Sequence, residues 1–190
     1  MIKVTYIDHM GSDLSVVNAA RVSFGKGSEW ESIETIGGEE KVLLKSDQKL
    51  IGYLAKHGHM SPFGHAFASF HVKAPVFVAR QLVKHKFLRW NEISRRYVND
   101  APEFYRPVLQ SGIEAAKQYT YLLKMGVCEE QARMVLPLNH MTEWYWSGSL
   151  DAFADMCRLR VATDTQGETR DVAKQIDEVM DELFPVSWNE

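Results

Sequence analysis

Apolar and polar positions alternate with a period of two at two places in the first half of the chain. Residues 2–8 alternate in the manner of a strand. Residues 66–72 predict a second, half-buried strand, whose apolar side is formed by Ala66, Ala68, Phe70 and Val72. Between these two strands, apolar residues recur with the spacing of a helix. This spacing predicts a short helix over 13–22, capped by Ser12 or Asp13, and another from Ser46 to about His57.

The second half of the chain is mostly helical in pattern. Pro75 is suited to open a helix that runs through VFVARQLVKHK. Further amphipathic segments cover 111–125, 128–135, 149–163 and 168–184. The segments 25–40 and 57–65 are rich in Gly and polar residues and are expected to be loops. Because the strands come early and the helices late, the order favours an α+β fold over a doubly wound sheet.

The size and composition indicate a globular protein with one domain over residues 1–190. The formal net charge of −3 argues against a dedicated nucleic-acid binder, which usually carries a strongly basic domain. No apolar run is long enough to span a bilayer, so no membrane partner is expected. Two cysteines, Cys128 and Cys157, give no disulfide framework and suit a reducing cytoplasm.

Against this acidic background, the segment KHKFLRWNEISRRY (84–97) gathers cations around one carboxylate, that of Glu92. The cations are Lys84, Lys86, Arg89, Arg95 and Arg96. A solvated helix face is the ordinary explanation of such a run. Here Trp90, Ile93 and Tyr97 interrupt the polar face, which favours a loop that presents Arg and Lys to an anion.

Other polar residues admit both a structural and a functional interpretation. Arg133 and Arg160 stand in apolar helical segments, where an arginine either extends its head to water or meets a ligand anion. The histidines at 57, 59, 65 and 71 lack a strong metal signature, so no metal site is predicted. Neither cysteine has the surroundings of a nucleophile, so a cofactor is expected to carry any difficult step.

The segment from His57 to Tyr97 resembles the flavin-dependent thymidylate synthases (the ThyX family). Their signature is Arg-His-Arg-x-x-Ser-x-Asn-Glu-x-Ser-x-Arg-Tyr. This chain has Lys84-His85-Lys86 in place of Arg-His-Arg and Arg89 in place of Ser, and it matches at Asn91, Glu92, Ser94, Arg96 and Tyr97. GVCEEQARMVLPLN (126–139) and SLDAFADMCRLR (149–160) extend the resemblance, which covers about residues 2–184.

The resemblance implies methylation of dUMP to dTMP, with FAD as cofactor and methylenetetrahydrofolate and NADPH as co-substrates. It implies a homotetramer with shared active sites, and a mainly antiparallel sheet flanked by helices. Positions matching the family's dUMP contacts are Gln81, Lys84, Glu92, Ser94, Arg95, Arg96, Arg133 and Arg160. Of these, Arg160 would stabilise charge on the pyrimidine and Ser94 would orient the ring, as the catalytic residues.

The family's FAD contacts fall on a second set of positions. They are Ser61, Lys84, His85, Lys86, Glu92, Ser149, Leu150, Asp151 and Asp155, with His59 as a further contact. The chain departs from its relatives here: lysines replace arginines at 84 and 86, and position 151, often Arg, is Asp. A lysine keeps the charge but loses the planar fork of a guanidinium.

Two alternatives remain open from sequence. The same fold could modify a pyrimidine deoxynucleotide differently, by hydroxymethylation of dUMP or dCMP. A non-catalytic nucleotide- or RNA-binding protein would use the basic segment, with Trp90 and Tyr97 as stacking groups. The acidic net charge, and the distance in sequence of Arg133 and Arg160 from the basic segment, count against the second alternative.

Overall fold

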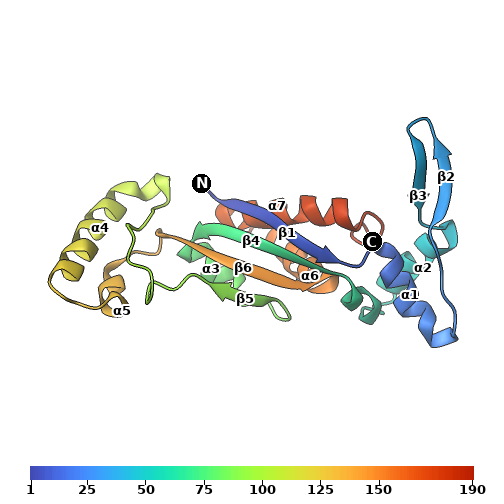
Figure 1. Ribbon diagram of the computed structural model, residues 1–190, viewed down its shortest axis with the longest axis horizontal. Helices are drawn as coiled ribbons and strands as arrows, with labels where there is room; N and C mark the ends of the chain where they lie inside the picture. Colours follow the sequence, from blue (N-terminus) through green and yellow to red (C-terminus); the bar gives the residue numbers. More distant parts are fainter.

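The computed structural model describes residues 1–190, which fold around a four-stranded sheet of order β1-β4-β6-β5 (Figure 1). All neighbouring strands are antiparallel. The strands are β1 (Lys3–Met10), β4 (Phe67–Pro75), β5 (Arg89–Glu92) and β6 (Met141–Ser149). A separate two-stranded hairpin consists of β2 (Glu31–Thr35) and β3 (Gly38–Val42).

Seven α-helices accompany these strands, so the predicted α+β class with an antiparallel sheet is confirmed. They are α1 (Asp13–Arg21), α2 (Lys45–Lys56), α3 (Val76–Leu82), α4 (Leu109–Lys124), α5 (Glu129–Ala132), α6 (Leu150–Arg160) and α7 (Gly167–Leu183). Short 3-10 turns η1 (Val22–Phe24), η2 (Ser61–His65), η3 (Arg106–Val108) and η4 (Arg133–Val135) join some of them. No helix is both long and apolar enough to cross a membrane.

One face of the four-stranded sheet forms the core. Helices α3, α6 and α7 pack on this face, as Figure 1 shows. Phe70 of β4 meets Phe153 of α6 edge to face at 5.2 Å between ring centroids, and Trp146 of β6 meets the same ring at 5.6 Å. Because side chains alternate across a strand, the apolar positions expected at 66, 68, 70 and 72 all lie on this face, and all four are buried.

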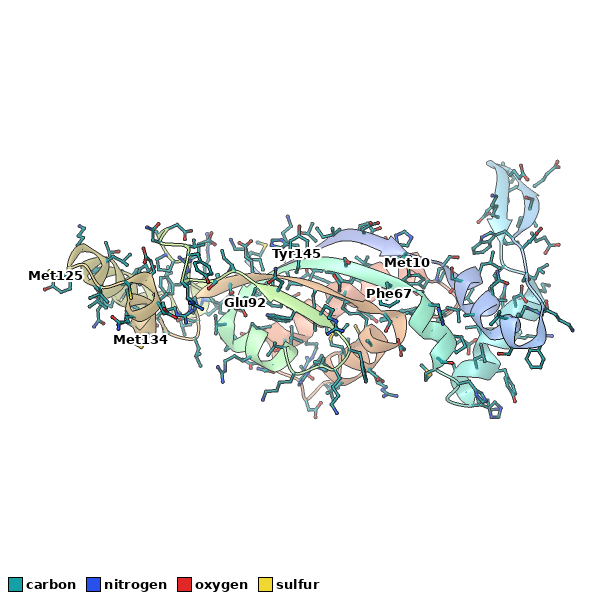
Figure 2. All side chains as sticks on the ribbon, turned by 60° about the horizontal axis from the view of Figure 1, so that its bottom comes forward. Met10, Phe67, Glu92, Met125, Met134 and Tyr145 are labelled. Carbon is teal, nitrogen blue, oxygen red and sulfur yellow. The ribbon has the colours of Figure 1, made fainter.

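The opposite face of the sheet carries polar side chains and no helix. Its cross-strand rows include His71 beside Tyr145, with rings 5.4 Å apart, and Ser69 bonded to Ser147 at 2.9 Å. Figure 2 shows Tyr145 on the side of the sheet away from the helices. Tyr145 is 51% exposed, whereas its neighbour Trp146 is 1% exposed, so the two faces differ sharply in burial.

Two extensions give the molecule its elongated outline in Figure 1. At one end lies an arm of α4 and α5; at the other lie α1, α2 and the β2–β3 hairpin. Met125 and Met134, labelled on the arm in Figure 2, are 64% and 76% exposed. The apolar surface of the arm is therefore left uncovered within one chain.

The structure corrects several expectations about the elements. The helix expected through VFVARQLVKHK ends at Leu82, and residues 84–88 form a turn in which Phe87 has φ +65°. Residues 89–92 of the expected basic loop are strand β5, and most of the expected loop 25–40 belongs to the β2–β3 hairpin. Strand β6 was not among the predicted elements. A four-residue strand such as β5 exists only through its pairing, which local sequence does not reveal.

The expected cap of the second helix is also wrong. Helix α2 starts at Lys45, before Ser46, and its N-cap is Leu44. Asp47 of its first turn is fully buried and accepts hydrogen bonds from Arg21 and Ser28. This buried carboxylate ties α2 to α1, so the helix start is set by a tertiary contact rather than by a local cap.

Candidate functional site

The first group of predicted site residues lies where the ends of α3 and α6 meet. We call Gln81, His85 and Arg160 the arginine–histidine cluster. Arg160, the last residue of α6, donates from Nε to Nε2 of His85 at 2.9 Å and from Nη2 to the main-chain oxygen of Gln81 at 3.2 Å. The side-chain amide of Gln81 is held by Gln166 and Thr169 at the start of α7. These bonds join three helices.

The imidazole of His85 is neutral in this cluster. Because its Nε2 accepts from a guanidinium, the ring proton is on Nδ1. Burial lowers the pKa of His85 below its ordinary value of 6.5, and the charge of Arg160 lowers it further, against an opposing effect of Asp155. Asp155 is thus close enough to act electrostatically on the same cluster.

The turn that follows α3 presents Lys84 and Lys86 to solvent. Neither lysine forms an ion pair with an acidic residue of the chain. Arg89, at the start of β5, forms none either. Gly148 of β6 lies against this turn, next to Phe87 and Leu88. A Cβ at that glycine would stand 2.3 Å from Cδ2 of Leu88, so a larger residue would require the Leu88 side chain to shift.

The second group surrounds a small cavity of about 150 Å³ at the junction of β5, β6 and η4. We call its lining the arginine pocket, and it consists of Glu92, Ile93, Arg95, Arg133, His140, Met141 and Thr142. Glu92 is fixed by Thr142, whose hydroxyl donates to Oε1 at 2.6 Å, and by Trp90, whose indole donates to Oε2 at 3.2 Å. Figure 2 places Glu92 on β5, toward the arm.

The guanidinium groups around this pocket differ in how they are paired. Arg95 donates to the main chain of Asp100 and to its carboxylate, at 2.9 and 2.7 Å. Arg133 donates only from Nε, to the oxygen of Glu130 at 3.3 Å, so both terminal nitrogens are free of acceptors. The pocket therefore holds donors of the kind that bind phosphate or carboxylate.

Ser94 and Arg96 lie in the turn after β5. The hydroxyl of Ser94 accepts from the main-chain nitrogen of Arg96 at 3.3 Å, which keeps the serine at the turn. Arg96 forms an ion pair with Glu130 of α5 at 3.0 Å. Both residues are thus tied to the side of the arginine pocket that faces the arm.

A third group lies at the N-terminus of α6. Ser149 donates to the carboxylate of Asp151, and Leu150 has a buried side chain and donates its main-chain nitrogen to Ala66 at 2.8 Å. One turn further, Asp155 pairs with Arg158 at 2.8 Å. The turn η2, which contains Ser61 and follows His59, packs on α6. Both Ser61 and His59 are exposed.

The arginine pocket and the α6 N-terminus are far apart within one chain. Thr142 and Ser149 mark opposite ends of β6, and the seven residue steps between them span roughly 24 Å. The structure thus brings the residues expected to bind dUMP into two clusters, and sets Ser149 and Asp151 apart from the arginine pocket.

Sequence reasoning missed His140 and Thr142 of the pocket, and Gln166 and Thr169 beside Gln81. A signal for Thr142 existed. In MTEWYWSGS the apolar Trp144 and Trp146 alternate with Glu143, Tyr145 and Ser147, which is the pattern of a half-buried strand. That strand would have placed Thr142 on the same face as the tryptophans.

No group of three or more His, Cys, Asp or Glu side chains is arranged to hold a metal ion. Cys157 is buried in the core, where burial raises the pKa of its thiol. A thiol in that environment is protonated and inert as a nucleophile. The side chains gathered at the candidate site carry guanidinium, imidazole, carboxylate and hydroxyl groups.

This geometry can be compared with known proteins. Residues 5–186 match the family described as "Thymidylate synthase complementing protein". The chain is 38% identical over 203 residues to the flavin-dependent thymidylate synthase of Thermotoga neapolitana, covering 97% of this chain and 88% of that one. The enzyme of the same name from Thermus thermophilus is 37% identical over 211 residues, covering 97% and 73%.

A solved structure is similar across the whole chain. It is the UMP/dUMP methylase PolB from Streptomyces cacaoi bound with 5-Br dUMP, with a TM-score of 0.82 and 30% identity. The alignment covers 100% of this chain and 94% of that one. A second structure of PolB, bound with 5-Br UMP, gives a TM-score of 0.79 at 29% identity.

The family match and the curated relatives place the chain among methyltransferase enzymes rather than among passive binding modules. More particularly, the chain belongs to the flavin-dependent thymidylate synthase family, as the resemblance of its motifs implied.

Proposed function

We propose that the protein methylates dUMP to dTMP, with FAD as cofactor, methylenetetrahydrofolate as carbon donor and NADPH as reductant. Membership of the family supports this reaction. The observation that carries it in this chain is the arginine pocket, because Arg95 and Arg133 converge from segments far apart in sequence on one cavity. Convergent guanidinium groups in a partly enclosed space are suited to a nucleotide phosphate.

The proposed nucleotide contacts come from both clusters. They are Gln81, Lys84, Glu92, Ser94, Arg95, Arg96, Arg133 and Arg160. Arg160 stabilises the negative charge that develops on the pyrimidine, and Ser94 orients the ring. One nitrogen of the Arg160 guanidinium, Nη1, has no partner in the chain. It can donate to the pyrimidine ring while Nε and Nη2 keep their hydrogen bonds.

Some of the proposed FAD contacts are positively charged side chains without a partner in the chain, which suits an anionic dinucleotide. Lys84 and Lys86 are exposed and unpaired, as a diphosphate requires. The carboxylates that would oppose it are already engaged, Asp151 by Ser149 and Asp155 by Arg158. His59, Ser61, His85, Glu92, Ser149 and Leu150 complete the proposed set. When bound and reduced, the flavin would supply the hydride for the reductive methylation.

We also propose a homotetramer with shared sites, and the separation of the two ends of β6 supports this proposal. Because the arginine pocket and the α6 N-terminus lie at opposite ends of β6, one chain does not bring Ser149 and Asp151 to its own arginine pocket. A second copy that places its α6 N-terminus against the pocket would complete the site. The uncovered face of the sheet and the exposed apolar residues of the arm offer surface for such contacts.

The test is a reaction assay with purified protein. FAD is added, and release of tritium from 5-tritiated dUMP is measured with methylenetetrahydrofolate and NADPH. Yellow protein and tritium release that requires all three components support the proposal. Protein that neither binds FAD nor releases tritium contradicts it. Mass analysis of the product separates a methyl group from the hydroxymethyl group of the alternative reaction.

UMP is a second candidate substrate. The structural neighbour PolB is described as a UMP/dUMP methylase and is similar over the full chain. The same assay with 5-tritiated UMP, and with unlabelled UMP competing against labelled dUMP, measures whether this chain accepts the ribonucleotide.

A further inference from the structure

His140 is a lining residue of the arginine pocket that the sequence motifs did not indicate. Its main chain is fixed at the entry to β6: the nitrogen donates to Pro137 at 3.0 Å, and the oxygen accepts from Val76 of α3 at 3.0 Å. An isolated bridge to Phe104 holds it from the side of the arm. The imidazole therefore starts from a rigid backbone, as a binding residue requires.

The hydrogen bond of its ring determines the tautomer. Nδ1 lies 2.7 Å from the main-chain oxygen of Pro137. A carbonyl oxygen only accepts, so the proton of the neutral ring is on Nδ1. Nε2 is then a hydrogen-bond acceptor, and it has no partner anywhere in the chain.

The environment keeps the ring neutral. Burial lowers the pKa of His140 below its ordinary value of 6.5. The hydrogen bond to Pro137 raises the pKa, the charge of Arg95 lowers it, and the charge of Glu92 raises it. The direction of the net shift leaves a lone pair on Nε2 at neutral pH.

The other lining groups show which ligand atom would meet this lone pair. Arg95 and Arg133 can only donate hydrogen bonds, and both oxygens of Glu92 already accept from Trp90 and Thr142. A fully ionised phosphate has no hydrogen to offer Nε2. A ligand that satisfies the pocket would bring anionic oxygens for the guanidinium groups and an N–H or O–H hydrogen for the imidazole. A sugar phosphate carries both within a few bonds.

We propose that Nε2 of His140 accepts a hydrogen bond from a sugar hydroxyl group of the bound uridine nucleotide, so that His140 is a further substrate-contacting residue. The inference rests on the proposed function, since it takes the pocket as the nucleotide site. His140 then distinguishes a nucleotide from a bare phosphate, whereas Arg95 and Arg133 bind the phosphate of either.

The experiment removes the acceptor and the hydroxyl separately. The His140→Asn variant retains an amide donor near the position of Nδ1 but has no atom at the position of Nε2. Calorimetric titration gives the Kd of wild type and variant for UMP, dUMP and 2′,3′-dideoxyuridine monophosphate. We expect wild type to bind the dideoxynucleotide roughly five- to tenfold more weakly than dUMP, as for loss of one hydrogen bond. His140→Asn should bind the two alike.

A loss confined to UMP relative to dUMP would support the same bond at the 2′-hydroxyl. The proposal is overturned if His140→Asn weakens all three nucleotides by one common factor, or weakens none. Equal affinity of wild type for all three refutes it even if the variant fails to fold. His9→Phe is the matched control, because His9 is an exposed histidine on β1, at the sheet edge opposite β5.

The two proposals fail in different ways. If wild type binds none of the nucleotides, the proposed function is wrong. If wild type binds dUMP, and Arg133→Ala weakens that binding, but no hydroxyl dependence is seen, only the role of His140 is wrong.

Discussion

The arginine–histidine cluster and the arginine pocket both present guanidinium groups, but they use them differently. In the first, two nitrogens of Arg160 donate hydrogen bonds, one to His85 and one to the main-chain oxygen of Gln81 at the end of α3. In the second, both terminal nitrogens of Arg133 are free. Arg160 holds helices together and keeps one guanidinium nitrogen free, whereas Arg133 has both of its terminal nitrogens free.

This difference shows that equal charge does not imply equal function. A guanidinium that bonds to a neutral imidazole and a helix end is oriented before the substrate arrives, which suits stabilisation of a transition state. A guanidinium with free terminal nitrogens at a cavity suits tight binding of a phosphate. Substitutions in the two clusters should therefore differ in what they change.

The largest expected effect is that of Arg160→Ala. Turnover should fall at least about a hundredfold, because the cation that we propose to stabilise charge on the pyrimidine is lost. The free energy of unfolding should also fall by about 1–2 kcal/mol, since two hydrogen bonds are removed. Steady-state kinetics and urea unfolding measure the two effects. Near-normal turnover would refute the role of Arg160, and Arg160→Lys, which keeps the charge, should retain more activity than the alanine variant.

Next comes Arg133→Ala in the arginine pocket. The Kd for dUMP should rise roughly 10- to 100-fold, as for a hydrogen bond to a charged group. The free energy of unfolding should change by no more than about 0.5 kcal/mol, because little of the side chain is bonded within the chain. Arg106→Ala, at an exposed arginine beside α4, is the control and should leave the Kd unchanged. Equal effects of Arg160→Ala and Arg133→Ala on the Kd for dUMP would contradict the distinction between the clusters.

Gly148→Ala tests the support of the turn that carries Lys84 and His85. The added methyl group would collide with Leu88 and approach the oxygen of Phe87 to 3.2 Å. We expect a loss of roughly 1–3 kcal/mol in the free energy of unfolding, as for overpacking, together with weaker FAD binding. Gly167→Ala, where an added Cβ meets nothing, serves as the control in denaturant unfolding. An equally small change in both variants would show that the turn adapts freely.

The smallest effect concerns pH. The pKa values of His85 and His140 are lowered from 6.5, chiefly by burial. Below pH 6.5 the unfolded chain therefore binds protons that the folded chain does not, so stability is lost as pH falls from 6.5 toward the folded pKa values. Each histidine contributes at most about 1.4 kcal/mol per pH unit. Unfolding of wild type and of His85→Gln/His140→Asn at pH 7.5 and 5.5 checks this; an unchanged pH dependence in the double variant would contradict it.

Local pattern predicted the helices of this protein well. The segments expected at 13–22, 111–125 and 168–184 correspond to α1, α4 and α7 within a few residues. A helix bonds to itself, so its own sequence carries most of the signal. Strand β4 was also predicted, because the buried residues from Ala66 to Val72 alternate without interruption.

Strand β5 and the β2–β3 hairpin were beyond the prediction, whereas β6 was missed although Trp144 and Trp146 alternate with polar residues as in a half-buried strand. Residues 89–92 of β5 contain three polar side chains and gain their strand conformation only by pairing with β6, Arg89 opposite Ser147 and Glu92 opposite Trp144. The hairpin is almost entirely exposed, so no buried face marks it in the sequence. Pairing between distant segments leaves little local trace when a strand is short or uncovered.

For the candidate site, the sequence determined which chemical groups are present and which family motifs they form. Through the family resemblance it proposed Arg95, Arg133 and Arg160 as dUMP contacts and His85 as an FAD contact. Their division into an arginine–histidine cluster and an arginine pocket, and the entry of His140 into the latter, were decided only by the tertiary structure. The register of β5 on β6 and the meeting of α3 with α6 set these neighbours, and such contacts depend on packing across the whole sheet rather than on any local pattern.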